Sequence, residues 1–427
     1  MSGDVDQDAV LQARNVLLSS ARLTRRQEAE AYRVLAKVSP ASYAPKLANA
    51  LIHLSFDDSL RELPEARLNL CREAVDAARR LDESDPRHAE VLLDALKWYQ
   101  RRLFELGRRP EALTVGAEMA GISRRAVDAD RDAPLWTGLT LWARSLAEEG
   151  RHAEAAELLE EFVRHSRPGG AREGTFAWSL IEWCAEAEAA GLRDTALNAA
   201  QELVELQRGQ LALGHCSLAS LLLTLLRQAE LYDGYGQRDA ASAALAEAAI
   251  LLAELAANGE PKVWSGYQFT YWVVLFGLSG RAAELPAPGR PGPALGAYVR
   301  DWAPDIWERH FAELPALREA VERAEDPADR VAAHRKLTIR SALHSELRRG
   351  NRFLEPVLPL FDEGVSLARR LGDEARSARA LFDRASALTA GHRYADAYAD
   401  FQEAQNLRNS CDMREVRALP PSRDPQR

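Results

Sequence analysis

Residues that could support catalysis or metal binding are scattered along this sequence. It contains no glycine-rich phosphate loop followed by Lys-Ser or Lys-Thr, no dinucleotide-binding fingerprint, no His-Glu-x-x-His and no nucleophile elbow. The nine histidines do not cluster at ligand spacing. His53 and Asp57 lie one helical turn apart, but a metal site needs three or four converging ligands. We therefore expect a protein that is not an enzyme, with no catalytic residue, no metal site and no cofactor.

The charge of the chain restricts the class of partner. Lys and Arg total 55 against 64 Asp and Glu, which gives a formal charge of −9 and a pI near 5.6. A protein that neutralises phosphates needs a basic surface, so we expect no nucleic-acid partner.

The acidic N-terminus, the apolar stretches and the cysteines bear on localisation. The first residues lack the charged and apolar regions of a secretory signal. The apolar stretches 211–226 and 264–278 are shorter than the roughly 20 residues of a membrane span. The four cysteines show no paired spacing, which is typical of a reducing compartment. We expect a soluble, cytoplasmic protein with no membrane partner.

A glycine followed five residues later by an alanine recurs along the chain. The alanines are 43, 41 and 45 residues apart, and the pairs are Gly107/Ala112, Gly150/Ala155, Gly191/Ala196 and Gly236/Ala241. Each glycine is placed to end one amphipathic helix, and each alanine lies early in the next. A nearly constant period of this length predicts a stacked array of helical hairpins.

The helices before these glycines share a second pattern. Ala143, Cys184 and Ala229 each lie seven residues before a repeat glycine and are flanked by large residues. A small side chain at this position lets the two helices of a hairpin approach closely. Taken together, the two patterns resemble the tetratricopeptide repeat. The Arg-, Ala- and Leu-rich composition also makes the chain similar to soluble tetratricopeptide proteins of high-GC actinobacteria, which implies a bacterial source.

The resemblance implies an all-α fold, a right-handed α-solenoid of helix-turn-helix repeats with an irregular insert. The period is longer than the family's usual 34 residues, and the proline that usually closes a unit is mostly missing. The extra residues are expected to lengthen helices or the loops between repeats. Weaker units are expected around Ala66, around Pro356, where alanine is replaced by proline, and at Gly391/Ala397, where the spacing is six.

The repeat pattern fails between about Asn258 and Arg340, which sets the expected domain organisation. Residues 1–257 form an N-terminal helix and repeat array, and 258–300 an insert rich in aromatic residues and in proline and glycine. Residues 301–410 form a C-terminal helical region with two repeat-like units, and 411–427 a disordered tail. Within the insert we expect Trp264, Tyr271 and Trp272 to be buried and the stretch 286–293 to be exposed.

The family's geometry implies where a ligand would bind. The first helices of the repeats would line a concave face, with Lys97, Arg101 and Arg144 pointing into it. Arginine binds carboxylates through two hydrogen bonds, so these side chains could bind an acidic peptide or its terminal carboxylate. The alternative is that they form ion pairs within the array. Trp178 and Ile181 would make the same face apolar further along, either as part of the groove or beneath the aromatic insert.

The sequence thus favours a non-catalytic scaffold that binds a protein or peptide on the concave face of the array. The peptide-binding candidates are Lys97, Arg101, Arg144, Trp178 and Ile181. The alternative function is a signalling sensor arm that binds a peptide or small effector and regulates a separate output protein. The sequence does not identify the partner.

Overall fold

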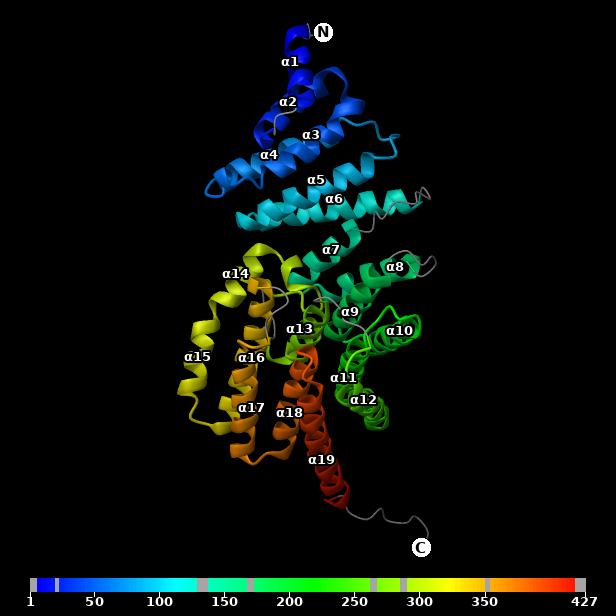
Figure 1. Cartoon of the computed structure of the whole chain (residues 1–427), viewed down its shortest axis with the longest axis vertical. Helices are drawn as coiled ribbons and strands as arrows, with labels where there is room; N and C mark the ends of the chain where they lie inside the picture. Colours follow the sequence, from blue (N-terminus) through cyan, green and yellow to red (C-terminus); the bar gives the residue numbers. More distant parts are fainter. Residues whose placement is uncertain are drawn as a thin grey trace. The chain divides into compact units, whose positions relative to one another are not determined.

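The computed structural model describes residues 6–19, 23–128, 137–166, 173–261, 267–284, 290–349 and 354–418, and within them it is all-α, without a β-strand (Figure 1). The α-helices are α1 Gln7–Leu18, α2 Arg25–Val38, α3 Pro40–Leu54, α4 Pro64–Ala78, α5 His88–Glu105, α6 Arg109–Asp128, α7 Thr137–Glu148, α8 His152–Ser166, α9 Glu173–Ala189, α10 Arg193–Ala212, α11 Leu218–Gly234, α12 Arg238–Asn258, α13 Tyr267–Ser279, α14 Pro304–Ala312, α15 Leu314–Arg323, α16 Pro327–Arg349, α17 Leu358–Leu371, α18 Glu374–Ala390 and α19 Tyr394–Ala418. Short 3₁₀ helices span Asp58–Leu60, Arg281–Ala283 and Val299–Asp301.

The chain divides into two compact units. Unit 1 comprises Met1–His165 together with Ala303–Ile306, and unit 2 comprises Ser166–Trp302 and Trp307–Arg427. The division falls inside the array that we expected to run from residue 1 to 257, so the predicted boundaries differ from these units.

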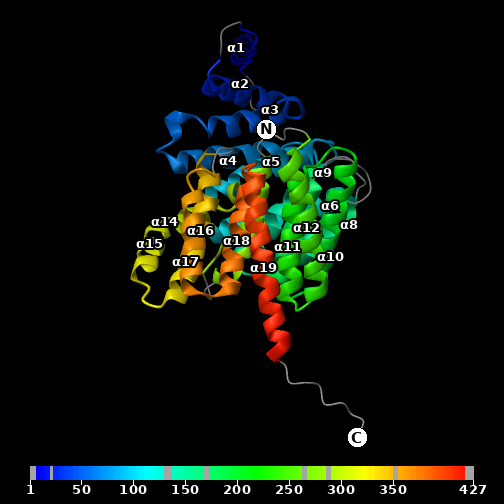
Figure 2. The same cartoon turned by 60° about the horizontal axis from the view of Figure 1, so that its bottom comes forward.

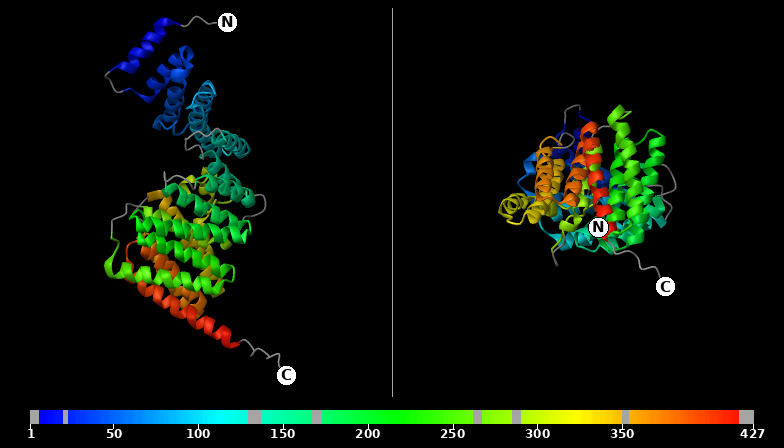
Figure 3. Two further views of the ribbon diagram at one scale, coloured as in Figure 1. Left: turned by 90° about the vertical axis from the view of Figure 1, so that its right-hand side faces the viewer. Right: turned by 90° about the horizontal axis from the view of Figure 1, so that it is seen from below.

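In unit 1, each helix from α1 to α6 packs against the next one along the chain. In unit 2, α9 packs against α10, α10 against α11 and α11 against α12, so that successive hairpins stack (Figure 3). Packing between sequence neighbours is how a solenoid buries its core. The expected all-α solenoid of helical hairpins is therefore confirmed.

The turns of four hairpins have the same backbone geometry. Gly107, Gly150, Gly191 and Gly236 have φ between +68° and +75°, the left-handed region that glycine adopts without a steric penalty. In the second of these turns, the N–H of Arg151 donates to the carbonyl of Leu146 at 2.9 Å, and the other three turns repeat this bond. The helices therefore end at glycine because the turn requires a left-handed backbone conformation, in which a residue with a side chain would be strained.

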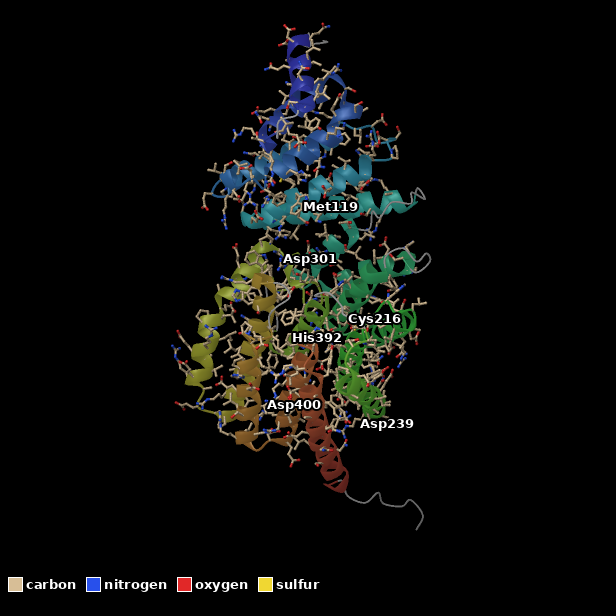
Figure 4. The ribbon with its side chains drawn as sticks, in the orientation of Figure 1. Met119, Cys216, Asp239, Asp301, His392 and Asp400 are labelled. Atoms are coloured by element: carbon tan, nitrogen blue, oxygen red, sulfur yellow. The ribbon has the colours of Figure 1, made fainter. Side chains whose placement is uncertain are left out.

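The alanines of the repeat occupy the fourth position of the following helix. Their side chains are fully buried, with 0% of the surface exposed in each of Ala112, Ala155, Ala196 and Ala241. Helices of neighbouring hairpins also lie close to each other. A Cβ on Gly138 of α7 would lie 2.3 Å from the carbonyl oxygen of Met119 on α6, the residue labelled in Figure 4. The predicted register of these four repeats is confirmed.

One of the three weaker repeats follows the same rule, with its turn shifted by one residue. At the turn between α18 and α19, His392 (Figure 4) has the left-handed conformation, with φ +60°, and it lies five residues before Ala397, which is 0% exposed. The glycine-to-alanine spacing of six arises because His392 replaces glycine in this conformation. The expected equivalence of Ala66 is wrong, because α4 begins at Pro64 and its fourth residue is Arg67.

Pro356 also does not occupy the alanine position. It is exposed in the turn before α17, and the fourth residue of that helix is Phe361, which is 3% exposed.

Part of the segment that breaks the repeat pattern is helical, while 290–298 is irregular. Residues 267–279 form α13, which packs against α11, α16 and α18. Tyr271 and Trp272 are 0% and 1% exposed, as expected from their size, whereas Trp264 lies outside the described residues. In the proline-rich stretch, Arg290 is exposed and 291–293 are half-buried, while 286–289 lie outside the described residues.

The C-terminal hairpin of unit 2 packs back against its array. Helix α19 packs against α18 and also lies beside α12 (Figure 2). Elsewhere in the array the second helix of one hairpin contacts the first helix of the next, as α10 contacts α11. Here the second helix of one hairpin, α12, contacts the second helix of another, α19. Residues 411–418, which we expected in a disordered tail, belong to α19, and 419–427 lie outside the described residues.

One helix of the described residues, α12, is long and apolar enough to cross a membrane when judged by length and composition alone. Core helices of soluble proteins pass the same test, and Ala241, Leu245, Ala248, Leu252 and Leu255 of α12 are buried. These side chains serve its packing within unit 2.

Candidate functional site

Helices α5 and α7 carry the three cations predicted to bind a carboxylate. Lys97 and Arg101 lie one turn apart on α5, Arg144 lies on α7, and all three are half-buried. The side-chain amide of Gln100 donates to the hydroxyl of Ser145 at 3.3 Å, which joins the two helices at the residues next to Arg101 and Arg144. The two arginines therefore lie at neighbouring positions on contacting helices. Convergence of the three cations on one ligand stays a prediction.

Arg101 belongs to a cluster of three arginines around one carboxylate, that of Glu105. The Glu105 oxygens lie 2.7 Å from Arg102 Nη1, 3.6 Å from Arg67 Nη1 and 3.9 Å from Arg101 Nε. The Glu105 carboxylate thus lies within 4 Å of three guanidinium groups. We call Arg67, Arg101, Arg102 and Glu105 the arginine cluster. Burial, and after it the nearby Arg102 guanidinium, lower the pKa of Arg67, because both disfavour its charged form.

Arg102 lies at the base of the arginine cluster and is 2% exposed. Its Nε and Nη2 atoms are buried and have no hydrogen-bond partner among the described residues. The guanidinium carbon lies 4.7 Å from the centre of the Phe56 ring, a cation–π contact, and Phe56 itself meets Trp98 edge-on with ring centres 4.7 Å apart. Phe56 is 39% exposed, so apolar surface adjoins the positive charge.

In unit 2, the corresponding face of the array is covered. Ile181 on α9 is 1% exposed, and Trp178 is half-buried with its ring 5.8 Å from that of Tyr271 on α13. Gly296 lies against α9 so closely that a Cβ there would be 2.5 Å from the Cβ of Ala185. Of the two alternatives for Trp178 and Ile181, this structure has the covered one. Peptide binding at these two residues would require α13 and the loop at Gly296 to move.

Buried hydrogen bonds attach this cover to the array. The hydroxyl of Tyr271 lies 2.6 Å from Gln207 Nε2 on α10 and 2.7 Å from Thr224 Oγ1 on α11, and Thr224 donates to Gln207 Oε1 at 2.9 Å. Buried polar groups that bond to one another fix a single packing arrangement, because displacing α13 would leave them unpaired. The covered face is therefore a specific interface within unit 2.

The sequence did not predict the contribution of Arg67, Arg102 and Glu105. Helix α5 carries Arg101, Arg102 and Glu105 within five residues. A count of charged residues along that helix would have shown a local excess of arginine. Arg67 lies on α4, and only the packing of α4 against α5 brings it to Glu105. Among the described residues, no group of three or more His, Cys, Asp or Glu side chains could hold a metal ion.

Comparisons with known proteins give two solved structures at low sequence identity and low TM-score. No protein-family model matches the chain, and no curated protein matches it in sequence. A crystal structure of BtubC (BKLC) from P. vanneervenii is 17% identical, with a TM-score of 0.43, over 60% of this chain and 94% of that one. A circular tandem repeat protein with a novel repeat topology is also 17% identical, with a TM-score of 0.16, over 96% of this chain and 90% of that one. The all-helical repeat architecture of the chain therefore rests on its own helices and their packing, not on these likenesses.

Proposed function

We propose that this protein is a non-catalytic scaffold that binds an acidic protein segment or peptide through unit 1. The observation that carries this proposal is the arginine cluster, in which three guanidinium groups gather within 4 Å of the Glu105 carboxylate. A peptide carboxylate would be attracted to this concentration of guanidinium groups, and arginine binds carboxylates with paired hydrogen bonds. Lys97 and Arg144 extend the positive surface along α5 and onto α7.

The aromatic pair next to the arginine cluster supports a peptide over a simple anion. Phe56 and Trp98 contact each other, and the ammonium of Lys97 lies 5.4 Å from the centre of a Trp98 ring. A ligand with an acidic group and an apolar side chain would contact both kinds of surface, as partner-binding surfaces rich in Arg and aromatic residues do.

Binding of acidic peptides by the full-length chain tests this proposal. The probes are fluorescent peptides that carry two aspartates, a leucine and a free carboxyl terminus, and fluorescence anisotropy measures their affinity. We expect Arg101→Ala/Arg144→Ala to weaken binding at least tenfold, and we expect the wild-type affinity to fall with added salt because charge pairs are screened.

The matched control is Arg124→Ala/Arg164→Ala, which removes two other arginines of unit 1. Both form exposed ion pairs, Arg124 with Glu161 and Arg164 with Glu160, away from the arginine cluster. The proposal is contradicted by an equal loss of affinity in the control, or by peptide binding that is indifferent to the test substitutions.

We further propose that the hairpins are tetratricopeptide repeats of a cytoplasmic protein from a high-GC actinobacterium. The support is the shared turn, in which a left-handed residue precedes a buried alanine by five positions in five hairpins. The second helices α6, α10 and α12 have 20, 20 and 21 residues, and such long helices account for much of the period beyond 34.

A further inference from the structure

Unit 2 contains a cavity of about 330 Å³ that the proposed function does not use. It lies between the array helices α11 and α12 and the helices α13, α18 and α19 that pack against them. A volume of this size is at the lower end of the range of small-molecule sites, roughly 300–1,000 Å³. Two of the side chains that line the cavity, those of Asp233 and Arg379, are each 37% exposed, so the cavity opens to solvent beside them.

The charged side chains that line the cavity are already paired with one another. They are three arginines and three acidic residues, so their charges balance. A charged ligand would therefore find its counter-ion only by breaking one of these pairs, which leaves another charge uncompensated. The pairs are Arg227 with Glu230 at 3.1 Å, Arg379 with Glu230 at 2.9 Å and with Asp383 at 3.2 Å, and Arg408 with Asp233 at 2.8 Å.

The serine hydroxyls of the lining are also occupied. Ser386 Oγ accepts the indole N–H of Trp272 at 2.9 Å and donates to a backbone carbonyl at 2.8 Å. Ser279 Oγ accepts from an arginine of α16 at 2.8 Å and donates to a backbone carbonyl at 2.7 Å. The Nε atoms of Arg227 and Arg379 have no hydrogen-bond partner among the described residues, but they are buried and do not reach a ligand. Polar groups on a ligand would thus gain little here.

The rest of the lining is mainly apolar. Leu226 of α11 and Phe382 of α18 are half-buried, so they keep surface that a ligand can cover. Trp272 and Phe276 of α13 are 1% and 4% exposed, and their rings stack with centres 5.2 Å apart, which makes this side of the cavity rigid. Removing apolar surface from water is therefore the main source of affinity that this cavity offers.

We propose that this cavity binds one small, neutral, apolar molecule. Its surface would pack against Leu226, Phe382 and the leucines beside them. A charged molecule would give up its hydration without gaining a counter-ion, which costs free energy. A cavity of about 150 Å³ in another protein holds benzene, so this one has room for a fused ring system. The proposal goes beyond the proposed function and is independent of it, since it concerns the other unit.

Three molecules that share one ring system and differ in charge test this proposal on the full-length chain. They are indole, indole-3-acetate and tryptamine, which are neutral, anionic and cationic at neutral pH. Saturation-transfer difference NMR detects weakly bound ligands, and titration gives the affinity of each molecule. We expect indole to bind at least tenfold more tightly than either charged molecule, because the paired wall favours neither charge.

Two variants that fill the cavity locate the site. Leu226→Trp enlarges a half-buried side chain of the lining, and Gly234→Trp adds a ring where a Cβ would meet nothing within 4 Å. We expect each variant to weaken indole binding at least tenfold. The matched control is Ala332→Trp, at an exposed position on α16 that lines a second cavity, of about 210 Å³, and not this one. We expect this control to bind indole like the wild type.

A third variant tests the charge argument. Asp233→Asn removes the carboxylate that pairs with Arg408 at the exposed end of the cavity. We expect the affinity for indole-3-acetate to rise at least threefold relative to that for indole. An unchanged ratio would mean that charge pairing does not exclude anions from the cavity.

The proposal is overturned if indole does not bind, or if a charged molecule binds as tightly as indole. It is also overturned if a filling variant that circular dichroism shows to be folded binds indole like the wild type, or if Ala332→Trp loses binding to the same extent. If neither filling variant folds, the ratio measured for Asp233→Asn still decides. This test and the peptide test fail separately, because they substitute residues of different units.

Discussion

At the scale of single residues, the hairpin turns depend on a backbone conformation that side chains disfavour. The four repeat glycines have positive φ, and a Cβ on Gly107, Gly150, Gly191 or Gly236 would meet nothing within 4 Å. Packing therefore does not require glycine at these positions. The requirement comes from the backbone, because an L residue in the left-handed region costs roughly 1–2 kcal/mol.

The same substitution at two glycines of unit 2 should have opposite effects. Gly191→Ala places a Cβ on a residue with φ +73°, and we expect the free energy of unfolding to fall by about 1 kcal/mol. Gly209→Ala lies within α10 in open space, and we expect a gain of about 0.5–1 kcal/mol because alanine favours helix. Urea denaturation measures both values, and equal shifts would contradict this account of the turns.

The buried alanines should not accept a larger side chain. Ala155→Leu, Ala196→Leu or Ala241→Leu adds volume at positions that are 0% exposed, so we expect each to cost about 1–3 kcal/mol of stability. The control is Ala243→Leu, at an exposed position on α12. The midpoint of urea denaturation should fall for the first three variants and stay near the wild-type value for the control.

Buried histidine makes the stability of unit 2 depend on pH. Burial and the nearby Arg340 lower the pKa of His310 from 6.5 to about 4, and its Nε2 has no hydrogen-bond partner among the described residues. Below pH 6.5 the unfolded chain takes up a proton that folded His310 does not. This contribution to stability is therefore complete above pH 6.5 and is lost as the pH falls toward 4, by up to about 3 kcal/mol.

His310→Phe should remove that part of the pH dependence, because the new ring cannot titrate. Urea denaturation between pH 4 and 7 measures it, with His215→Asn at an exposed position as the control. An unchanged slope in His310→Phe would show that folding does not change the pKa of His310.

At the scale of elements, the structure decides which helix faces are covered. In unit 2 the face that carries Ile181 packs beneath α13 and the loop at Gly296, and buried hydrogen bonds to Tyr271 fix that arrangement. Tetratricopeptide-like sequence patterns on α9 and α11 therefore do not guarantee an open groove. The amount of apolar surface on α13 is what favours coverage.

The contact between the loop and α9 can be tested at Gly296. Its φ of +113° and the 2.5 Å approach of a Cβ to Ala185 mean that Gly296→Ala must shift the loop. We expect a loss of about 1–3 kcal/mol and faster hydrogen exchange at α9. Gly292→Ala in the same loop meets nothing within 4 Å and serves as the control. Equal stability of the two variants would show that the loop does not pack on α9.

At the scale of the molecule, unit 2 is held together by helices from both sides of the proline-rich stretch. Helix α13 packs against α16 and α18, and α12 packs against α19. A site-specific protease sequence placed after the exposed Arg290 should therefore cut the chain without separating the fragments. Size-exclusion chromatography in native buffer measures this. Two separate fragment peaks would mean that the two sides fold as independent domains.

The sequence by itself determined the hairpins of this protein, because local chemistry sets them. Glycine in the left-handed turn and alanine at the fourth helical position are visible as a spacing of five, and these positions were predicted correctly in four repeats. In the hairpin of α18 and α19 the left-handed residue was predicted one position too early, at Gly391, because His392 adopts a conformation that composition alone does not predict. Ala66 and Pro356 were misassigned since Arg67 and Phe361 occupy the position without resembling alanine.

Only the tertiary structure decided what covers the array and where charge collects. The helical state of 267–279 and the contact of α19 with α12 depend on packing between segments far apart in sequence, which no local pattern encodes. The arginine cluster likewise needs Arg67 from α4 beside Glu105 from α5, and the cavity needs five helices to meet. Periodicity is a property of neighbours along the chain, whereas a site is a property of neighbours in space. The sequence thus predicted the repeating unit, and the fold determined the surfaces that it presents.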